Sequence, residues 1–172
     1  ARGQSPGAVF HFERAGESAC FALGQRSVFP AMEPMTEDTI FDAASVTKVV
    51  ATATSVLVLF DQDKIALDAP VRTHLREFTG EGRDEITVRH LLTHVSGLHP
   101  SLSQNPPWSG YETGIKLACT HAPETTPGSA FRYSDINFIL LGEIVHRVSG
   151  ERHRAVRIAP LELRRFLIPS AM

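Results

Sequence analysis

The sequence has few cysteines, no basic block and no long apolar run. Its two cysteines, Cys20 and Cys119, are far apart and have neither a redox nor a zinc-ligand spacing, so we expect two buried thiols. The 17 basic and 19 acidic residues are scattered, which argues against a surface that follows phosphates and therefore against a nucleic-acid partner. The longest apolar stretches, such as residues 56–60 and 138–141, are much shorter than the roughly 20 residues that cross a bilayer, so we expect no membrane span.

The length of the chain fits one domain. A chain of 172 residues hides about 70% of its unfolded surface when it folds, which is enough for one hydrophobic core. Short apolar runs at residues 7–13 and 18–23 flank a segment that contains glycine, and this pattern predicts a β-hairpin. A long helix is expected over residues 45–61. We therefore expect a single domain in which residues 1–62 hold the hairpin and this helix, and residues 63–172 are rich in further helices.

Helical periodicity recurs along most of the remaining chain. Further helices are expected at residues 86–92, 111–119 and 135–148, where Gly150 follows the last one as a stop signal. In the first helix, apolar residues recur at steps of three and four, so we expect it to be mostly buried. These residues are Val49, Val50, Ala53, Val56, Leu57 and Phe60. Because a hairpin comes first and helices follow, an α+β, or layered α/β, architecture is favoured.

The segment Ser45-Val46-Thr47-Lys48 is the only Ser-x-x-Lys in the chain, and it stands where a loop becomes a helix. A spacing of three places both side chains on one face of the helix. A serine hydroxyl needs a neighbour that takes its proton, and a lysine in a partly dry pocket can have its pKa lowered enough to help. The N–H groups of the helix N-terminus can stabilise an oxyanion. The segment predicts a serine nucleophile with a lysine partner, and a simple helix cap at Ser45 is the alternative.

A second candidate segment, Tyr133-Ser134-Asp135, lies just before the last predicted helix. A tyrosine in a loop at a helix start can bring its phenol oxygen beside a serine nucleophile and shuttle a proton together with a lysine. A Ser or Asp helix cap that follows an aromatic residue is the alternative interpretation.

Together these motifs resemble the serine β-lactamase and penicillin-binding-protein superfamily, of which Ser-x-x-Lys is a signature. The resemblance covers about residues 6–163 and depends on three segments in the same order as in the family: residues 41–48, 86–98 and 127–144. It is closest to the class C β-lactamase-like branch, which also contains carboxylesterases and D-amino-acid peptidases. The fold implied is the β-lactamase/transpeptidase-like fold.

The resemblance implies a serine hydrolase that acts on a small-molecule ester or amide, with no metal or organic cofactor. Ser45 would attack the carbonyl and form an acyl-enzyme, Lys48 and Tyr133 would share proton transfer, and the Ser45 N–H would be one oxyanion donor. The family usually has Asn at the position of Asp135, where its amide can donate a hydrogen bond to the substrate. An ionised carboxylate cannot donate. Asp135 therefore favours simple esters over β-lactams and peptides.

The end of the chain departs from the family pattern. Family members continue through strands that carry a Lys-Thr-Gly or His-x-Gly motif and a second oxyanion donor, and neither motif occurs in this sequence. Loss of one oxyanion donor typically slows catalysis about 10²- to 10³-fold. The alternative function is therefore a catalytically silent, shortened relative that acts as a binding or assembly module. A lone hairpin is marginal in water, so we expect either a second chain or another copy in a homo-oligomer on its open edge, or an exposed edge.

Three further features are candidates for binding. His90 and His94 are spaced four apart with His99 close behind, which is a zinc-like spacing, but no Glu follows His90. His94 is instead interpreted as a hydrogen-bonded structural group near the cleft, because the stretch matches the family's Leu-Leu-Thr-His segment. Trp108 is a candidate for the rim of the substrate site, with a loop anchor as the alternative. The basic tail, residues 152–165, is interpreted as a solvated helical face rather than a membrane-binding surface.

Overall fold

A computed structural model describes residues 5–150, so the expected helical face at residues 152–165 lies outside the described part of the chain. The contacts within the chain group into two compact units, one ending at Ala44 and the other beginning at Ser45. The single domain expected from the sequence, with parts at residues 1–62 and 63–172, stays a prediction. The helix that follows Ser45 belongs to the second unit because its Val56 and Leu59 are part of the core of that unit.

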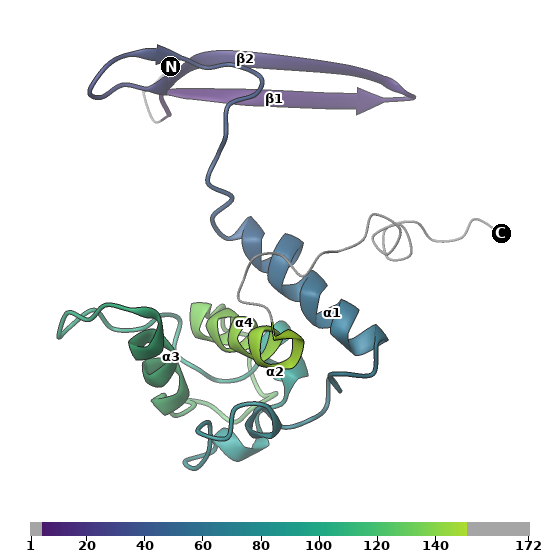
Figure 1. Cartoon of the computed structure of the whole chain (residues 1–172), viewed down its shortest axis with the longest axis vertical. Coiled ribbons are helices and arrows are strands. Elements are labelled where there is room, and N and C mark those ends of the chain that lie inside the picture. The colour runs from purple at the N-terminus through teal and green to yellow at the C-terminus, as the bar shows by residue number, and fades with distance from the viewer. Residues whose placement is uncertain (1–4, 151–172) are drawn as a thin grey trace. The chain divides into compact units, whose positions relative to one another are not determined.

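The first unit contains the predicted hairpin (Figure 1). Strands β1 (Gly7–Arg14) and β2 (Glu17–Ser27) pair antiparallel, with partners running from Gly7 and Gly24 to Arg14 and Glu17. The two residues between the strands, Ala15 and Gly16, both have positive φ values, 53° and 85°, as a tight two-residue hairpin turn requires. A short strand β3 (Glu33–Pro34), which the sequence did not predict, adds to β2 and completes a three-stranded antiparallel sheet.

Large apolar side chains are exposed on this sheet. Phe10 and Phe21 are cross-strand partners, and Phe12 lies two residues from Phe10 on the same face of the strand. The ring of Phe12 lies 6.4 Å from the rings of both Phe10 and Phe21, so the three aromatic side chains form one cluster. These three residues are nevertheless 46–60% exposed. The second chain expected on the open edge of this hairpin stays a prediction.

The second unit begins with the helix that follows Ser45. Its first part, Lys48–Ala53, is a π-helical turn, and α1 continues as a regular α-helix over Thr54–Asp61. The Thr54 hydroxyl donates to the Val49 carbonyl, five residues earlier, which matches the wider turn. The predicted helix is confirmed, but the prediction that it is mostly buried was wrong for its first half.

The wide turn explains why the predicted apolar stripe fails in the first half of the helix. A π turn holds more residues than an α turn, so side chains in and before it do not continue the stripe of the later residues. Val49 and Val50 are accordingly 62% and 64% exposed, whereas Val56 and Leu59 are buried. Phe60, also assigned to the stripe, is 46% exposed.

The other predicted helices are confirmed with small changes at their ends. They are α2 (Val88–Leu92), α3 (Tyr111–Thr120) and α4 (Asp135–Ser149), and short 3-10 turns lie at Val71–Thr73 and Arg83–Glu85. No helix among residues 5–150 is long and apolar enough to cross a membrane. The sheet followed by helices agrees with the predicted α+β class.

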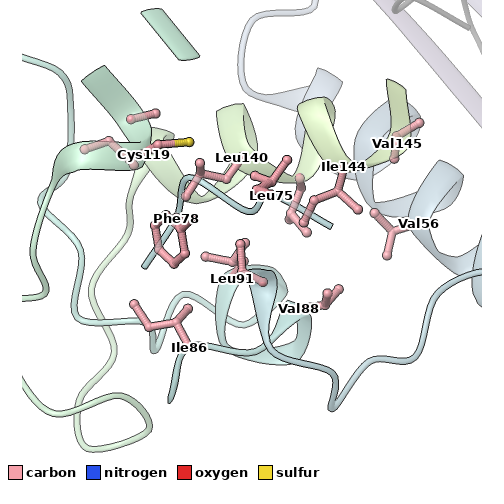
Figure 2. Packing of buried hydrophobic residues seen from close by; sticks show 14 of the residues in the cluster. Val56, Leu75, Phe78, Ile86, Val88, Leu91, Cys119, Leu140, Ile144 and Val145 are labelled. Atoms are coloured by element: carbon pink, nitrogen blue, oxygen red, sulfur yellow. The ribbon is translucent and has the colours of Figure 1, made fainter. Parts of the chain in front are cut away.

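Helix α4 is the centre of the second unit, because it packs against α1, α2 and α3 (Figure 1). Figure 2 shows side chains from all four helices gathered with those of Leu75 and Phe78. Cys119 of α3 is part of this cluster, and its burial raises the pKa of its thiol to about 11. Cys119 is therefore the buried thiol that was expected, while Cys20 on β2 is partly exposed. The core fixes the axis of α4 and with it the position of the helix N-terminus, where Tyr133, Ser134 and Asp135 lie.

Candidate active site

Ser45 and Lys48 lie next to each other at the start of the helix that leads into α1. The ammonium of Lys48 donates a hydrogen bond of 3.3 Å to the Ser45 hydroxyl. Just before them, Ala44 has a positive φ of 43°, and its N–H donates to the Asp42 carboxylate at 2.8 Å. Few residues other than glycine adopt positive φ values, so the chain makes a constrained turn directly before the proposed nucleophile.

Lys48 also contacts the first residue of α4 and Tyr133 in the loop before it. Its Nζ lies 2.7 Å from the Oδ1 atom of Asp135 and 5.1 Å from the centre of the Tyr133 ring. The structure therefore brings the two candidate segments together, although they are far apart in the sequence. Ser45, Lys48, Tyr133 and Asp135 all belong to the second unit.

The charge state of Lys48 differs from the sequence expectation. Burial acts to lower the pKa of Lys48, as expected, but the hydrogen bonds that its ammonium donates to Asp135 and Tyr133 outweigh burial, and the pKa is raised. Only 16% of the Lys48 side chain is exposed, so its charge is held mainly by these two neighbours. The expectation of a lysine with a lowered pKa was therefore wrong, because it did not take the carboxylate of Asp135 into account.

The pKa of Tyr133 shifts in the opposite direction to that of Lys48. Its hydrogen bonds with Ser45 and Lys48 lower the pKa of the phenol below its ordinary value. A protonated lysine has three N–H donors and no acceptor, so it cannot take the serine proton. Tyr133 is hydrogen-bonded to Ser45, and its oxygen can accept the serine proton once the phenol has lost its own, which the lowered pKa favours.

The loop around Tyr133 is fixed by main-chain groups of another loop. The Asp135 N–H donates to the Pro100 carbonyl at 2.7 Å, and the Ser134 hydroxyl donates to the His99 carbonyl, also at 2.7 Å. Ser134 is also the N-cap of α4, because its side chain accepts from the Asn137 N–H. Sequence reasoning missed the contribution of residues 99 and 100, because a carbonyl contact leaves no residue-type signature.

His94 is hydrogen-bonded beside the site, as the sequence suggested. Its Nδ1 atom lies 3.1 Å from the Ser134 N–H donor. His90 has a different role, because its backbone N–H and ring form a capping box with Thr87 at the start of α2. Within residues 5–150, no three His, Cys, Asp or Glu side chains gather in a way that could hold a metal ion.

Trp108 packs against α3. Its indole N–H donates to the Ser103 carbonyl at 2.7 Å, and its ring lies so close to Gly114 that a Cβ there would be 3.1 Å from it. These contacts match the loop anchor that was the alternative interpretation. The role of Trp108 at a substrate rim stays a prediction.

Comparison with known proteins identifies the family. The sequence profile described as Beta-lactamase matches residues 1–161. The chain belongs to the beta-lactamase family. Esterase EstB from Burkholderia gladioli is 36% identical over 140 residues, which make up 70% of this chain and 35% of the esterase. Acyltransferase calJ from Penicillium decumbens is 37% identical over 90 residues, or 44% of this chain and 21% of that protein.

Solved structures of the beta-lactamase family agree with this assignment. A class C beta-lactamase crystal structure superposes with a TM-score of 0.73 at 26% identity, covering 86% of this chain and 40% of that one. The family and its class C-like fold are therefore shown, as the resemblance implied, and with them membership of a superfamily of serine hydrolases. The chain spans well under half the length of these relatives.

Proposed function

We propose that this chain transfers acyl groups from an ester, with Ser45 as the nucleophile. The observation that carries the proposal is the hydrogen bond of 3.3 Å between the Lys48 ammonium and the Ser45 hydroxyl, in a group that also contains Tyr133. An ammonium that donates to the serine oxygen leaves the serine proton free to point toward the phenol oxygen of Tyr133. Tyr133, rather than Lys48, is the immediate general base in this proposal.

The proposed reaction has two stages. Tyr133 begins the reaction as the phenolate. The Ser45 oxygen forms a bond to the carbonyl carbon while its proton passes to the phenolate oxygen of Tyr133, and the carbonyl electrons form an oxyanion near the Ser45 N–H. The oxyanion then collapses, the bond to the leaving alcohol breaks, and the alcohol oxygen takes the proton from Tyr133. A water or a second alcohol attacks the acyl-serine in the same way and restores Ser45. Throughout, Lys48 remains protonated and stabilises the phenolate of Tyr133.

Asp135 supports an ester as the substrate. Its carboxylate is bound to Lys48 and, when ionised, offers acceptors only, so it cannot donate to a substrate amide oxygen. Half of its side chain is exposed, which places a negative charge where a carboxylate on the substrate would be repelled. The 36% sequence identity to an esterase is consistent with this preference. We therefore place uncharged esters ahead of β-lactams and D-peptides as substrates.

The test is covalent labelling of the folded chain. Incubation with a fluorophosphonate followed by peptide mass spectrometry should give one adduct, on Ser45, and none in Ser45→Ala. Ser109→Ala, which changes a serine in the loop before α3, should label as the wild type does. A folded wild-type chain that gives no adduct would reject the enzyme and favour the catalytically silent binding module.

A second measurement identifies the substrate class. Rates with a short p-nitrophenyl ester should exceed those with nitrocefin, which carries a carboxylate. Asp135→Asn should narrow this ratio by about tenfold, equivalent to about 1.4 kcal/mol, because a like charge is removed and a donor is added. A ratio that favours nitrocefin in the wild type would overturn the ester assignment while leaving Ser45 as the nucleophile.

A further inference from the structure

His94 holds the chain on both sides of Tyr133. Its carbonyl accepts from the Arg132 N–H at 2.7 Å, and its ring Nδ1 accepts from the Ser134 N–H at 3.1 Å. The residue adopts a positive φ of 57°, which lets its carbonyl and its ring reach the same segment. The residues on both sides of Tyr133, Arg132 and Ser134, therefore each donate a main-chain hydrogen bond to His94.

The ring of His94 also contacts the ring of Tyr133 directly. The two rings stack with their centres 4.5 Å apart and an angle of 30° between their planes. The rings of Phe131 and Phe138 also pack against the imidazole, with their centres 5.9 and 5.1 Å from its centre. The orientation of the imidazole is thus fixed by packing, and its position limits that of the phenol.

Hydrogen bonding determines which nitrogen of His94 carries a proton. Both neighbours of Nδ1 are donors: the Ser134 N–H and the side-chain amide of Asn137, whose nitrogen lies at 3.3 Å. The amide oxygen of Asn137 accepts from the Ser96 hydroxyl at 2.6 Å, which leaves its nitrogen facing His94. Nδ1 must therefore be unprotonated, and the neutral ring carries its proton on Nε2.

We propose that His94 is the positioning residue of Tyr133: the neutral imidazole holds the phenol toward Ser45, and a proton on Nδ1 releases the 132–134 segment. The inference rests on the proposed function, because Tyr133 is the base there. Protonation would turn the acceptor of the Ser134 N–H into a second donor, so that hydrogen bond would be lost. The stacked phenol would then lose one of its two main-chain anchors.

The surroundings favour the neutral form near pH 7. Burial lowers the pKa of His94, and the charge of Lys48 lowers it further, while the carboxylate of Asp135 acts in the opposite sense. The Tyr133 phenol, stacked on the ring, is a further titratable group that faces it. The acid form should therefore appear only below pH 6.5, the ordinary value for histidine.

Two substitutions separate positioning from general stability. In His94→Asn, the side-chain oxygen can occupy the place of Nδ1, and Asn tolerates positive φ better than most residues. In His94→Gln, the oxygen is one bond too far and the backbone preference is lost. We expect His94→Gln to lower kcat at least tenfold with little change in KM, and His94→Asn to recover most of that loss.

The pH profile gives the decisive readout. Hydrolysis of a p-nitrophenyl ester by the wild type should decline below pH 6.5, and His94→Asn should lack this acid limb. His74→Asn is the matched control, because burial also lowers the pKa of His74, which follows the 3-10 turn Val71–Thr73 and not the segment around Tyr133. The control should keep the limb of the wild type. An unchanged limb in His94→Asn, or full activity in His94→Gln, would overturn the proposal.

A second measurement does not depend on catalysis. The amide proton of Ser134, followed by NMR on the full chain, should titrate with a midpoint below pH 6.5 in the wild type and should not titrate in His94→Asn. Absence of this titration in the wild type would reject the release of the segment even if the enzyme is active. An inactive wild type in which Ser134 titrates would instead reject the proposed function, and with it the catalytic purpose of the contact.

Discussion

The carboxylate of Asp135 lies 2.7 Å from the ammonium of Lys48. Residues from two segments that are far apart in the sequence thus form one ion pair beside the proposed nucleophile. The pairing keeps a positive charge next to Ser45 and Tyr133, although burial alone would favour the neutral amine.

Removal of this carboxylate should change the alkaline limb of the activity profile. In Asp135→Asn, the charged neighbour that raises the pKa of Lys48 is gone and burial remains, so Lys48 should lose its proton at lower pH. If protonated Lys48 is needed, hydrolysis should begin to decline at lower pH than in the wild type. Rates measured from pH 7 upward, corrected for spontaneous hydrolysis, check this. Equal limbs in both proteins would show that the charge on Lys48 is not required.

The chain has two tyrosines, and they provide a matched pair of variants. Tyr133→Phe removes the phenol oxygen of the proposed base but keeps the ring that stacks on His94. We expect kcat to fall about 10²- to 10⁴-fold, the usual range for loss of a general base, with little change in the free energy of unfolding. Kinetics and a urea titration of the same sample measure both quantities.

Tyr111→Phe should show the reverse. The Tyr111 hydroxyl donates to Glu143, which is buried in α4. Loss of that donor should lower the free energy of unfolding by about 1 kcal/mol and leave kcat unchanged. A large loss of activity in this variant would mean that the contact at Glu143 is coupled to the site at the N-terminus of α4, contrary to our expectation.

Arg147 should contribute to stability in a pH-dependent way. Its guanidinium donates hydrogen bonds to buried Glu143 at 2.6 Å and to Glu77 at 3.1 Å. Arg147→Met leaves the charge of Glu143 with fewer partners, so we expect a loss of about 1–3 kcal/mol at pH 7, measured by urea unfolding. Arg72→Met, which removes an exposed pair with Asp84 at 3.7 Å, is the control and should stay within about 0.5 kcal/mol.

The pH dependence of this difference follows from Glu77. Hydrogen bonds from Arg147 lower the pKa of Glu77 in the folded chain. A lowered pKa stabilises the fold above the unfolded value and loses that effect as the pH falls. The difference in the free energy of unfolding between the wild type and Arg147→Met should therefore shrink below about pH 4.5, near the ordinary pKa of glutamate. A gap that widens in acid would contradict the assignment.

Core packing gives a prediction that does not depend on function. Leu140 of α4 is fully buried, whereas Val50 in the wide turn is 64% exposed. Leu140→Ala should lower the free energy of unfolding by about 2–5 kcal/mol, and Val50→Ala by less than about 0.5 kcal/mol. Similar losses in the two variants would show that Val50 is covered in solution.

The sequence predicted the helices and strands well, and the contacts and protonation of the site residues less well. The hairpin and the helix at 135–148 follow from alternation, glycine signals and periodicity, all of which are local properties. The contact between Lys48 and Asp135 was not predictable from spacing, because it depends on how α4 packs against the wide turn. The same packing decides that the pKa of Lys48 is raised rather than lowered.

The exposed valines show a second limit. Periodicity assumes 3.6 residues in every turn, so it placed Val49 and Val50 on the same stripe as Val56. No residue type announces a π turn, and the change of face at Lys48–Ala53 was therefore missed. His94, in contrast, was recognised as hydrogen-bonded, but its hold on both sides of Tyr133 depends on a backbone conformation that sequence does not reveal.

The π-helical turn also sets the orientation of the proposed nucleophile. It contacts α4 directly, and it sets the rotation of Ser45 and Lys48 relative to the rest of α1. Removal of one residue, such as Ala51, would restore an ordinary α-helix and swing everything before it by about 100° around the helix axis. Ser45 and Lys48 would remain neighbours on the same turn, but both would face away from Tyr133 and Asp135. A single extra residue in one turn is thus what directs the hydroxyl toward its partners across the unit.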